Sequence, residues 1–232
     1  MNYRLNDERL FAVAELVRPG SVVADIGADH CRLVSYLVAN GICPRGFACD
    51  IAQEPLESAR ATVQRLGLGD RISVLMTDGL LGLPISETDD IVIAGMGGEL
   101  IAQIIGASPS AFDKRLRFIL QPMTKAERLR RRLYRMGFCI TEEHGVRENG
   151  FVYTVMAAEY REERREVDEL FAWTGLLPKS NRPESRQMLF KIRSQLTEIA
   201  EGLDRSSKLA SSSLHYKGIL SELDSLLAEE ML

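Results

Sequence analysis

The sequence lacks the features that mark several large classes of protein. No apolar run approaches the ~20 residues that a membrane-spanning helix needs. The 4 cysteines form no CxxC pair and only 3 histidines accompany them, so we expect reduced thiols and no structural metal. The formal net charge of −4 gives no global basic field for nucleic acid, although a local basic face remains compatible with it. The charged, amphipathic start MNYRLNDERLFAVAELV is unlike a signal peptide, and we expect a cytoplasmic protein.

Two periodicities alternate through residues 1–160. Short buried-strand patterns are followed by amphipathic helical patterns, which is typical of a parallel sheet with right-handed crossovers. The expected parallel strands lie in SVVADIG, RGFACDI, RISVLMTDG, DDIVIAGMGG and LRFILQP. The stretch CITEEHGVRENGFVYTVMAAEY predicts two further strands without a helix between them. We therefore expect an α/β domain with an antiparallel strand at one edge of its sheet.

The composition changes near Tyr160. The charged segment REERREVDEL and the turn-rich GLLPKSNRPES are followed by two helical patterns with apolar residues at three- and four-residue steps. The apolar positions are Leu189, Ile192, Leu196, Ile199 and Leu203 in the first helix, and Tyr216, Leu220, Leu223 and Leu227 in the second. We expect residues 161–232 to form an antiparallel helical hairpin, a small coiled coil attached to the α/β domain of residues 1–160.

The turn DIGADH after the first predicted strand is the candidate ligand site, because open α/β sheets bind ligands at the carboxyl ends of strands. A dinucleotide site would need glycines where Asp29 and Arg32 stand, and a carboxylate would repel a pyrophosphate. S-Adenosylmethionine carries a sulfonium and an ammonium group and no phosphate. Asp25 and Asp29 can supply its counter-charge, while Gly27 keeps the turn tight. His30 could hydrogen-bond this ligand or cap the following helix.

Two later strands also end in acids. Asp50 ends the second strand, where an acid binds the ribose hydroxyls in either class of cofactor. Asp78 and Gly79 follow the third strand and suit a contact to the adenine edge. The alternative is that Asp25, Asp50 and Asp78 only cap helices or begin turns. Their occurrence at three successive strand ends favours a ligand site.

The fourth strand ends in IAGMGG, where many methyltransferases carry a sequence that binds an exocyclic amine. Gly95, Met96 and Gly97 would instead let the backbone approach a flat ligand closely. The alternative is a flexible crossover loop.

The motifs RLFAVAELV, ADIGADH, DGL, IAGMGG and FILQP, followed by a coiled-coil tail, resemble the bacterial tRNA (adenine(22)-N1)-methyltransferase family, TrmK. The resemblance implies a Rossmann-like class I methyltransferase sheet, S-adenosyl-L-methionine as methyl donor and N1 of adenine 22 in the D-arm of tRNA as acceptor. It also implies that Asp78 lies in the catalytic pocket. The expected cofactor-binding residues are Arg9, Asp25, Gly27, Asp29, His30, Asp50, Asp78, Gly79, Gly95, Met96 and Gly97.

The chain also departs from the family pattern. Met123 and Thr124 follow FILQP, where the family often has asparagine. If that asparagine contacts the adenine, Thr124 or Gln121 would have to replace it. Asp50 stands where relatives commonly carry glutamate, a change that preserves binding to a diol.

The segment TKAERLRRRLYRMG predicts a basic helix that could hold the phosphate backbone of tRNA. The alternative is an ordinary solvated helix face. The expected substrate-binding residues are Gln121, Thr124, Arg128, Arg131, Arg132 and Arg135, and the four arginines share one helical face. The helical hairpin could clamp tRNA or join two copies of the chain, and the sequence does not choose between these roles or set the oligomeric state.

Neutral adenine has a lone pair on N1, so methylation requires base flipping and alignment and no prior proton removal. Asp78 could stabilise the positive charge that develops on the product or could only hold the adenine of the cofactor. Three rival functions remain open: a methyltransferase for another RNA or a small molecule, a non-catalytic S-adenosylmethionine-binding module, and a nicotinamide oxidoreductase. Asp29 argues against the last of these.

Overall fold

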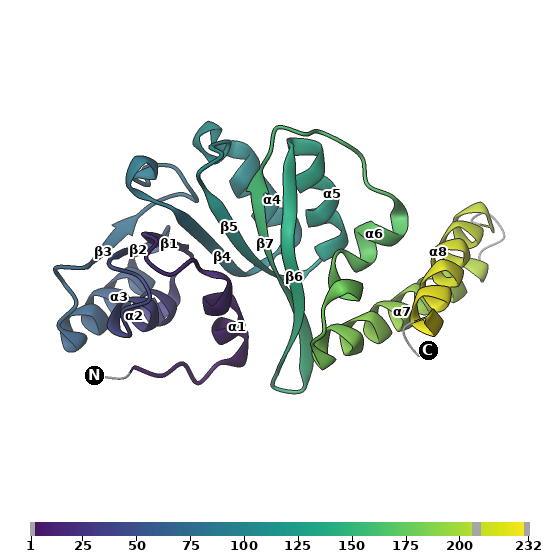
Figure 1. The fold of residues 1–232 in the computed structure, drawn as a ribbon, viewed down its shortest axis with the longest axis horizontal. Helices are drawn as coiled ribbons and strands as arrows, with labels where there is room; N and C mark the ends of the chain where they lie inside the picture. Colours follow the sequence, from purple (N-terminus) through teal and green to yellow (C-terminus); the bar gives the residue numbers. More distant parts are fainter. Residues whose placement is uncertain (1–2, 206–209, 230–232) are drawn as a thin grey trace.

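A seven-stranded sheet forms the centre of the protein in a computed structural model that describes residues 3–205 and 210–229 (Figure 1). The strands are β1 (Val23–Ile26), β2 (Gly46–Asp50), β3 (Ile72–Met76), β4 (Asp90–Gly97), β5 (Arg117–Thr124), β6 (Phe138–Glu148) and β7 (Phe151–Tyr160). Their spatial order is β3-β2-β1-β4-β5-β7-β6, and β1 to β5 pair in parallel. The expected Rossmann-like α/β sheet is therefore confirmed.

The sequence predicts an antiparallel strand at the edge of the sheet, but the antiparallel strand, β7, is the second strand from that edge. β7 pairs antiparallel with both β5 and β6, so β6 forms the edge and runs in the same direction as β5. The turn at Asn149 and Gly150 returns the chain, with both residues at positive φ. β7 suits the inner position because its middle is almost continuously buried, whereas β6 carries exposed residues in its first half.

Helices cover both faces of the sheet (Figure 1). The helices are α1 (Glu8–Leu16), α2 (Arg32–Ala39), α3 (Gln53–Leu66), α4 (Gly98–Ala107), α5 (Ala126–Met136), α6 (Glu169–Thr174), α7 (Pro183–Asp204) and α8 (Ala210–Glu229). α1, α2 and α3 contribute to one apolar core, and α4 and α5 contribute to a second. The two cores leave the carboxyl ends of the parallel strands free to carry a site.

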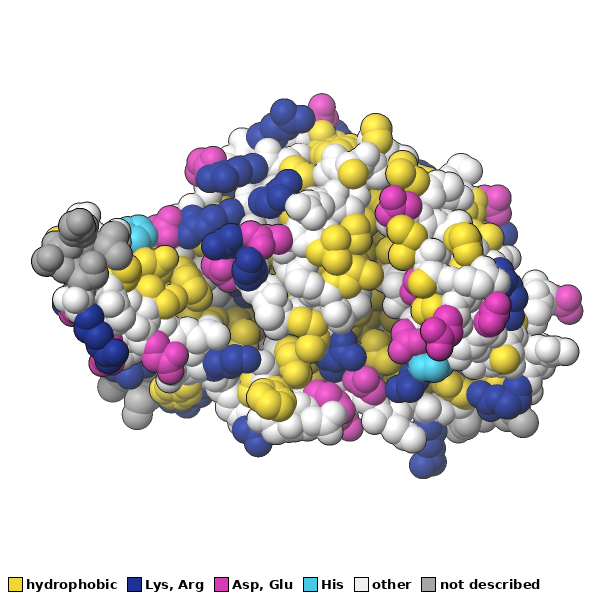
Figure 2. All heavy atoms as spheres, turned by 180° about the vertical axis from the view of Figure 1, so that it is seen from behind, with side chains coloured by type: hydrophobic (Ala, Val, Ile, Leu, Met, Phe, Trp, Pro, Cys, Tyr) yellow, Lys and Arg dark blue, Asp and Glu magenta, His cyan; other side chains and the backbone are white. Residues whose placement is uncertain are grey.

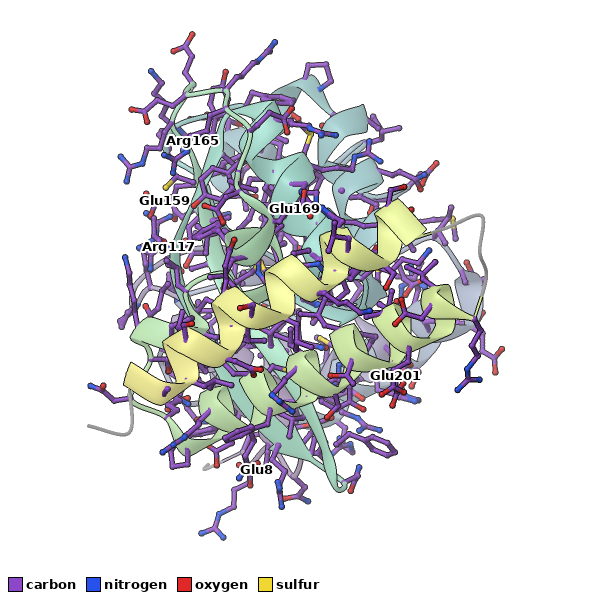
Figure 3. All side chains as sticks on the ribbon, turned by 90° about the vertical axis from the view of Figure 1, so that its right-hand side faces the viewer. Glu8, Arg117, Glu159, Arg165, Glu169 and Glu201 are labelled. Atoms are coloured by element: carbon purple, nitrogen blue, oxygen red, sulfur yellow. The ribbon has the colours of Figure 1, made fainter. Side chains whose placement is uncertain are left out.

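α7 and α8 form the expected helical hairpin and lie side by side in two views (Figures 1 and 3). Their seam is a third apolar core, made by Leu189, Ile192 and Leu196 with Ile219, Leu223 and Leu227. Two details differ from the expected heptads: Ala200 is buried where Ile199 was expected, and Ile219 is buried where Leu220 was expected. An α-helix has 3.6 residues per turn, so a straight seam drifts away from a strict seven-residue repeat.

A buried ion pair fastens the hairpin to the α/β domain. Arg130 of α5 lies 2.7 Å from Glu143 of β6, and both side chains are at most 1% exposed. Arg130 Nη1 also donates to the carbonyls of Ala172 and Trp173 at the end of α6, each at 2.8 Å. Glu143 accepts from the backbone N–H of Leu176 at 2.9 Å. The segment that leads to the hairpin is therefore held by hydrogen bonds from two elements of the sheet domain.

The four cysteines are free thiols, and Cys31, Cys43 and Cys49 are buried. Burial raises the pKa of Cys31 and Cys43 to about 11 and that of Cys49 to about 12, so these groups are neutral thiols near neutral pH. Across residues 3–205 and 210–229, no helix combines the length and apolar character needed to span a membrane.

Candidate functional site

The carboxyl ends of β1 and β4 form the first part of the candidate site. The turns after these strands line a pocket of about 260 Å³, which α1 covers from one side. The lining includes the predicted residues Arg9, Asp25, Gly27, Asp29 and Gly95. Residues from three separate motifs of the sequence are thus brought together at one edge of the sheet, as a site in an open α/β fold requires.

Asp25 is the most unusual group in this pocket. It is 7% exposed, and no hydrogen bond or ion pair reaches its carboxylate from residues 3–205 or 210–229. Burial, with the nearby charge of Asp50, raises the pKa of Asp25 from 3.8 to about 7. A buried acid without a partner is unfavourable in its ionised form unless a positive group joins it. The pocket is therefore suited to a cationic ligand.

Glycine is required at the turn after β1. Gly27 has φ +77°, and a Cβ at this position would lie 2.5 Å from Cε of Met96. Gly95 in the turn after β4 has φ +78°. Both positions would strain a residue with a side chain, and both line the pocket. The two glycine turns therefore leave the backbone open to a closely approaching ligand.

Asp29 and His30 lie at the outer side of the turn. Asp29 is 71% exposed and pairs with His30 Nε2 at 3.2 Å. His30 Nδ1 is hydrogen-bonded to the hydroxyl of Ser58 in α3. Among residues 3–205 and 210–229, no side chain donates or accepts a capping hydrogen bond at the first turn of α2. His30 therefore connects the turn to α3 and does not cap α2, which was one of its two expected roles.

Asp50 and Asp78 lie at the ends of β2 and β3. Asp50 is half-buried, and its carboxylate accepts from the backbone N–H of Ala52 at 2.9 Å. Asp78 is exposed and lines a different hollow of about 200 Å³ together with Gly79, Leu100 and Ile104. The structure therefore separates Asp78 from the pocket that contains Asp25, and a ligand that contacts both must extend across the strand ends.

Gln121 differs from its expected role. Its side chain is fully buried, and Oε1 accepts from Arg9 Nη1 at 2.7 Å and from the Gly95 N–H at 3.0 Å. Nε2 donates to the carbonyl of Pro122 at 3.1 Å. Both ends of the amide are thus engaged by the protein, which favours a bracing role in place of the expected base contact. The sequence indicates a polar residue at the strand end but contains no sign of this bracing.

Thr124 keeps a position that suits the acceptor. It is exposed at the end of β5 and is the register partner of Gly97 at the end of β4. Its hydroxyl lies 3.4 Å from the point where a Cβ of Gly97 would stand. Met96 and Gly97 connect this region to the glycine turns around Asp25. Thr124 can therefore reach a ligand that extends from the pocket along the ends of β4 and β5.

The arginines of α5 are more neutralised than the sequence suggested. Arg128 pairs with Glu99, Arg131 with Glu169 and Arg135 with Glu166. Arg132 is exposed and has no carboxylate partner in the part of the chain that the structure describes. Seen from behind, basic side chains gather beside the hairpin with acidic side chains between them (Figure 2). The basic face exists, but most of its charge is compensated locally.

Comparisons with known proteins agree on one family. The methyltransferase domain family model matches residues 6–156. A curated Bacillus subtilis tRNA (adenine(22)-N(1))-methyltransferase is 37% identical over 177 residues, which cover 76% of this chain and 74% of that protein. The crystal structure of the Bacillus subtilis m1A22 tRNA methyltransferase TrmK superposes with a TM-score of 0.80 and 32% identity, covering 98% of both chains. A Streptococcus pneumoniae protein in complex with S-adenosyl-L-methionine has a TM-score of 0.78 and 27% identity, covering 93% of this chain and 97% of its own.

Proposed function

The chain belongs to the tRNA (adenine(22)-N(1))-methyltransferase family, TrmK, and from this membership we propose that it transfers a methyl group from S-adenosyl-L-methionine to N1 of adenine 22 in tRNA. The structural observation that carries the proposal is the buried, unpartnered carboxylate of Asp25 beside two open glycine turns. When bound, S-adenosyl-L-methionine supplies a methyl group activated by attachment to a sulfonium.

The residues at the strand ends fit this cofactor. Asp25 offers a negative charge to its ammonium group, and Gly27 and Gly95 allow close approach of the amino-acid portion. Asp50, one strand further on, is placed to accept hydrogen bonds from the ribose hydroxyls. The hollow beside Asp78 then suits the adenine. Arg9, which is held by Gln121, closes the pocket from α1.

Methyl transfer to N1 of adenine requires the protein mainly to bind the two reactants and to align them. N1 of neutral adenine already carries a lone pair, so no residue has to remove a proton before the transfer. The base must leave its stack to reach a pocket at the sheet edge. Correct alignment of two bound reactants can lower the barrier by roughly 7–11 kcal/mol. Gly95, Gly97 and Thr124 provide an open surface on which the flipped adenine can be aligned.

The proposed role of Asp78 follows from its position. It lies in the hollow assigned to the cofactor's adenine and outside the Asp25 pocket, which favours cofactor binding over charge stabilisation at the acceptor. Asp78→Asn should therefore weaken binding of S-adenosyl-L-methionine with a smaller effect on the rate at saturating cofactor. Calorimetry and single-turnover kinetics measure the two quantities separately. A variant with normal cofactor affinity and a strongly reduced rate would instead assign Asp78 to catalysis.

Transfer RNA would bind on the side of the hairpin and α5. Arg132 offers an uncompensated charge, and Arg128, Arg131 and Arg135 could exchange their glutamate partners for phosphates. We propose a cytoplasmic location, which a tRNA substrate and four free thiols support.

The proposal is tested by methyl transfer from labelled S-adenosyl-L-methionine to unmodified tRNA, followed by mass spectrometry of the nucleosides. We expect N1-methyladenosine with the natural tRNA and none with a matched tRNA that carries guanine at position 22. Methyl incorporation that persists in the tRNA with guanine at position 22 would show that another nucleotide is methylated. No incorporation despite confirmed binding of cofactor and tRNA would refute the assignment.

A further inference from the structure

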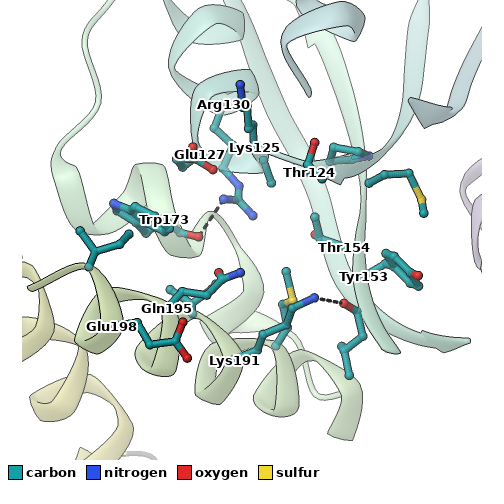
Figure 4. Close-up of a pocket in the computed structure, with 17 residues that line it drawn as sticks. Thr124, Lys125, Glu127, Arg130, Tyr153, Thr154, Trp173, Lys191, Gln195 and Glu198 are labelled. Atoms are coloured by element: carbon teal, nitrogen blue, oxygen red, sulfur yellow. Dashed lines mark hydrogen bonds between the residues drawn. The ribbon is translucent and has the colours of Figure 1, made fainter. Parts of the chain in front are cut away.

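A second cavity, of about 310 Å³, lies between the sheet domain and the helical hairpin (Figure 4). Residues 122–127 line it from the end of β5 and the start of α5, residues 152–154 line it from the start of β7, and α7 forms the opposite wall. Trp173 and Tyr153 lie at opposite ends of the cavity in Figure 4. The hairpin thus completes a concave site that the sheet domain does not form alone.

The cavity adjoins the proposed methyl-transfer site, shares Thr124 with it and is distinct from the Asp25 pocket. Both lie at the edge of the sheet where β4 and β5 end, and Thr124 belongs to the lining of the second cavity. No residue lines both this cavity and the Asp25 pocket. The fully buried side chain of Gln121 lies on the strand between them. Because Thr124 stands at both the cavity and the proposed adenine surface, a group bound in the second cavity would lie beside an adenine aligned there.

The side chains of the cavity combine a positive charge with aromatic and apolar surface. Lys191 Nζ donates to the carbonyl of Val152 at 2.9 Å and lies 5.7 Å from the centroid of the Tyr153 ring. Within residues 3–205 and 210–229, Lys191 has no carboxylate partner, so its charge is available to a ligand. Met188 and Ile199 add apolar surface, and α7 also presents an exposed amide and an exposed carboxylate, those of Gln195 and Glu198.

The floor of the cavity is preorganised. Arg130, which lines it, is 1% exposed and is fixed by Glu143 and by the carbonyls of Ala172 and Trp173. These bonds also set the position of Trp173 at one end of the cavity. A ligand would therefore meet a formed site, and little ordering of the protein would be needed before it binds.

This combination matches the recognition of an unpaired nucleotide. Proteins bind single-stranded nucleic acid by stacking bases on aromatic rings and placing cations beside phosphates. Amide and carboxylate groups can read the edge of a base that has left its helix. The volume lies at the lower end of the roughly 300–1,000 Å³ of small-molecule sites, which suits one nucleotide and excludes a duplex.

We propose that this interdomain cavity binds one unpaired nucleotide of the tRNA next to the methylated adenine, with its base at Tyr153 or Trp173 and its phosphate at Lys191. The inference rests on the proposed function for the identity of the RNA. It gives the helical hairpin a specific task, since α7 supplies Lys191 and one wall of the subsite.

Trp173 is the one tryptophan of the chain, so its fluorescence reports on the cavity directly. A nucleotide in the cavity should shield the half-buried indole and reduce its quenching by acrylamide at saturating unmodified tRNA. Saturation is established separately by filter binding. Unchanged quenching at full occupancy would overturn the proposal, whether or not the protein methylates adenine 22.

Kinetics then locate the nucleotide. Tyr153→Leu retains apolar volume but loses the aromatic face, and Lys191→Gln keeps a donor for Val152 but loses the charge. Lys179→Met, an exposed lysine outside the cavity, serves as the matched control. We expect each cavity variant to raise KM for tRNA roughly ten-fold, with kcat and cofactor affinity unchanged. Lys191→Gln should also lower the salt slope of tRNA binding by about one, while the control should change neither quantity.

A set of tRNAs with single abasic sites on either side of adenine 22 completes the test. The abasic tRNA that lacks the bound base should raise KM for the wild-type protein and have no further effect in Tyr153→Leu. Equal and additive losses in both proteins would overturn the assignment of the base to the cavity. If the wild-type protein does not methylate tRNA, the proposed function fails, and acrylamide quenching with the same tRNAs still decides whether the cavity holds a nucleotide.

Discussion

At the scale of single residues, the pocket contains an acid without a cationic partner in the described part of the chain and glycines in backbone conformations that other residues avoid. Asp25 is a buried acid without a cation, and Gly27 and Gly95 hold backbone conformations that side chains disfavour. Gln121 is the opposite case, since its amide is fully hydrogen-bonded and braces Arg9 and the Gly95 turn. The Asp25 carboxylate therefore marks where a ligand binds, and the hydrogen-bonded Gln121 amide holds the residues around that site in place.

The raised pKa of Asp25 predicts a pH-dependent affinity for the cofactor. Below about pH 7 the carboxyl is mostly protonated, and a cationic ligand must displace that proton when it binds. Affinity for S-adenosyl-L-methionine should therefore rise as the pH increases toward 7 and level off above it. Calorimetric titrations between about pH 5.5 and 8.5 measure this. Asp25→Asn should bind more weakly and lose this slope, and an identical slope in that variant would assign the proton to another group.

The same group affects stability without cofactor. Because the folded state holds the Asp25 proton up to about pH 7 and the unfolded chain releases it near 3.8, folding binds a proton between these values. This contribution makes the cofactor-free protein less stable as the pH rises through that window. Thermal unfolding of the wild-type protein and Asp25→Asn should converge at low pH and differ most near neutral pH.

At the scale of secondary-structure elements, α5 has a structural role that its composition conceals. Arg130 is buried against Glu143 of β6, and the same pair holds the end of α6 and the N–H of Leu176. Thr154 of β7 donates to Glu143 as well. The pair thus connects the helix, the last two strands and the segment leading to the hairpin. The helix that the sequence predicts as a nucleic-acid surface or a solvated face also anchors the hairpin to the sheet domain.

Breaking this pair should cost far more than breaking an exposed one. Glu143→Ala leaves the Arg130 charge buried and unpaired, which typically lowers the free energy of unfolding by about 3–5 kcal/mol. The matched control is Glu87→Ala, which removes an exposed pair with Arg45 and should change stability little. Urea denaturation followed by circular dichroism compares the variants. Equal small losses of stability in Glu143→Ala and Glu87→Ala would show that the buried Arg130–Glu143 pair contributes little to the attachment of the hairpin to the sheet domain.

At the scale of the whole molecule, the sheet domain and the hairpin are joined more closely than a linker at residue 160 would suggest. Phe171 packs edge-on against Tyr134, with ring centroids 5.4 Å apart. Val167 and Leu176 pack on the same apolar core beneath α5. The segment between Tyr160 and Pro183 therefore packs on the sheet domain, while Leu177 in the same segment belongs to the hairpin core, and α7 begins at Pro183.

This joint predicts the outcome of truncation. A protein ending at residue 160 leaves Arg130 without the carbonyls of Ala172 and Trp173 and Glu143 without the N–H of Leu176, whereas one ending at residue 180 keeps all three. The shorter protein lacks these hydrogen bonds, each of which contributes about 1 kcal/mol to stability. The longer protein should therefore melt at a temperature roughly 5–10 °C higher. Differential scanning calorimetry compares the two, and equal melting temperatures would restore the boundary at residue 160. Both truncated proteins lack the hairpin, so both should show a raised KM for tRNA.

The sequence by itself determined the order and type of the elements up to residue 160, the two helices of the hairpin, and the acids and glycines at the strand ends, but not α6. These follow from local patterns: hydrophobic periodicity separates strands from helices, and Gly27, Asp50 and Asp78 mark turns within a few residues of each strand. Only the tertiary structure decided that Gln121 braces, that Arg130 is buried and that Asp25 has a raised pKa. Those properties depend on distant partners and on exclusion of water, which exist only once the elements pack.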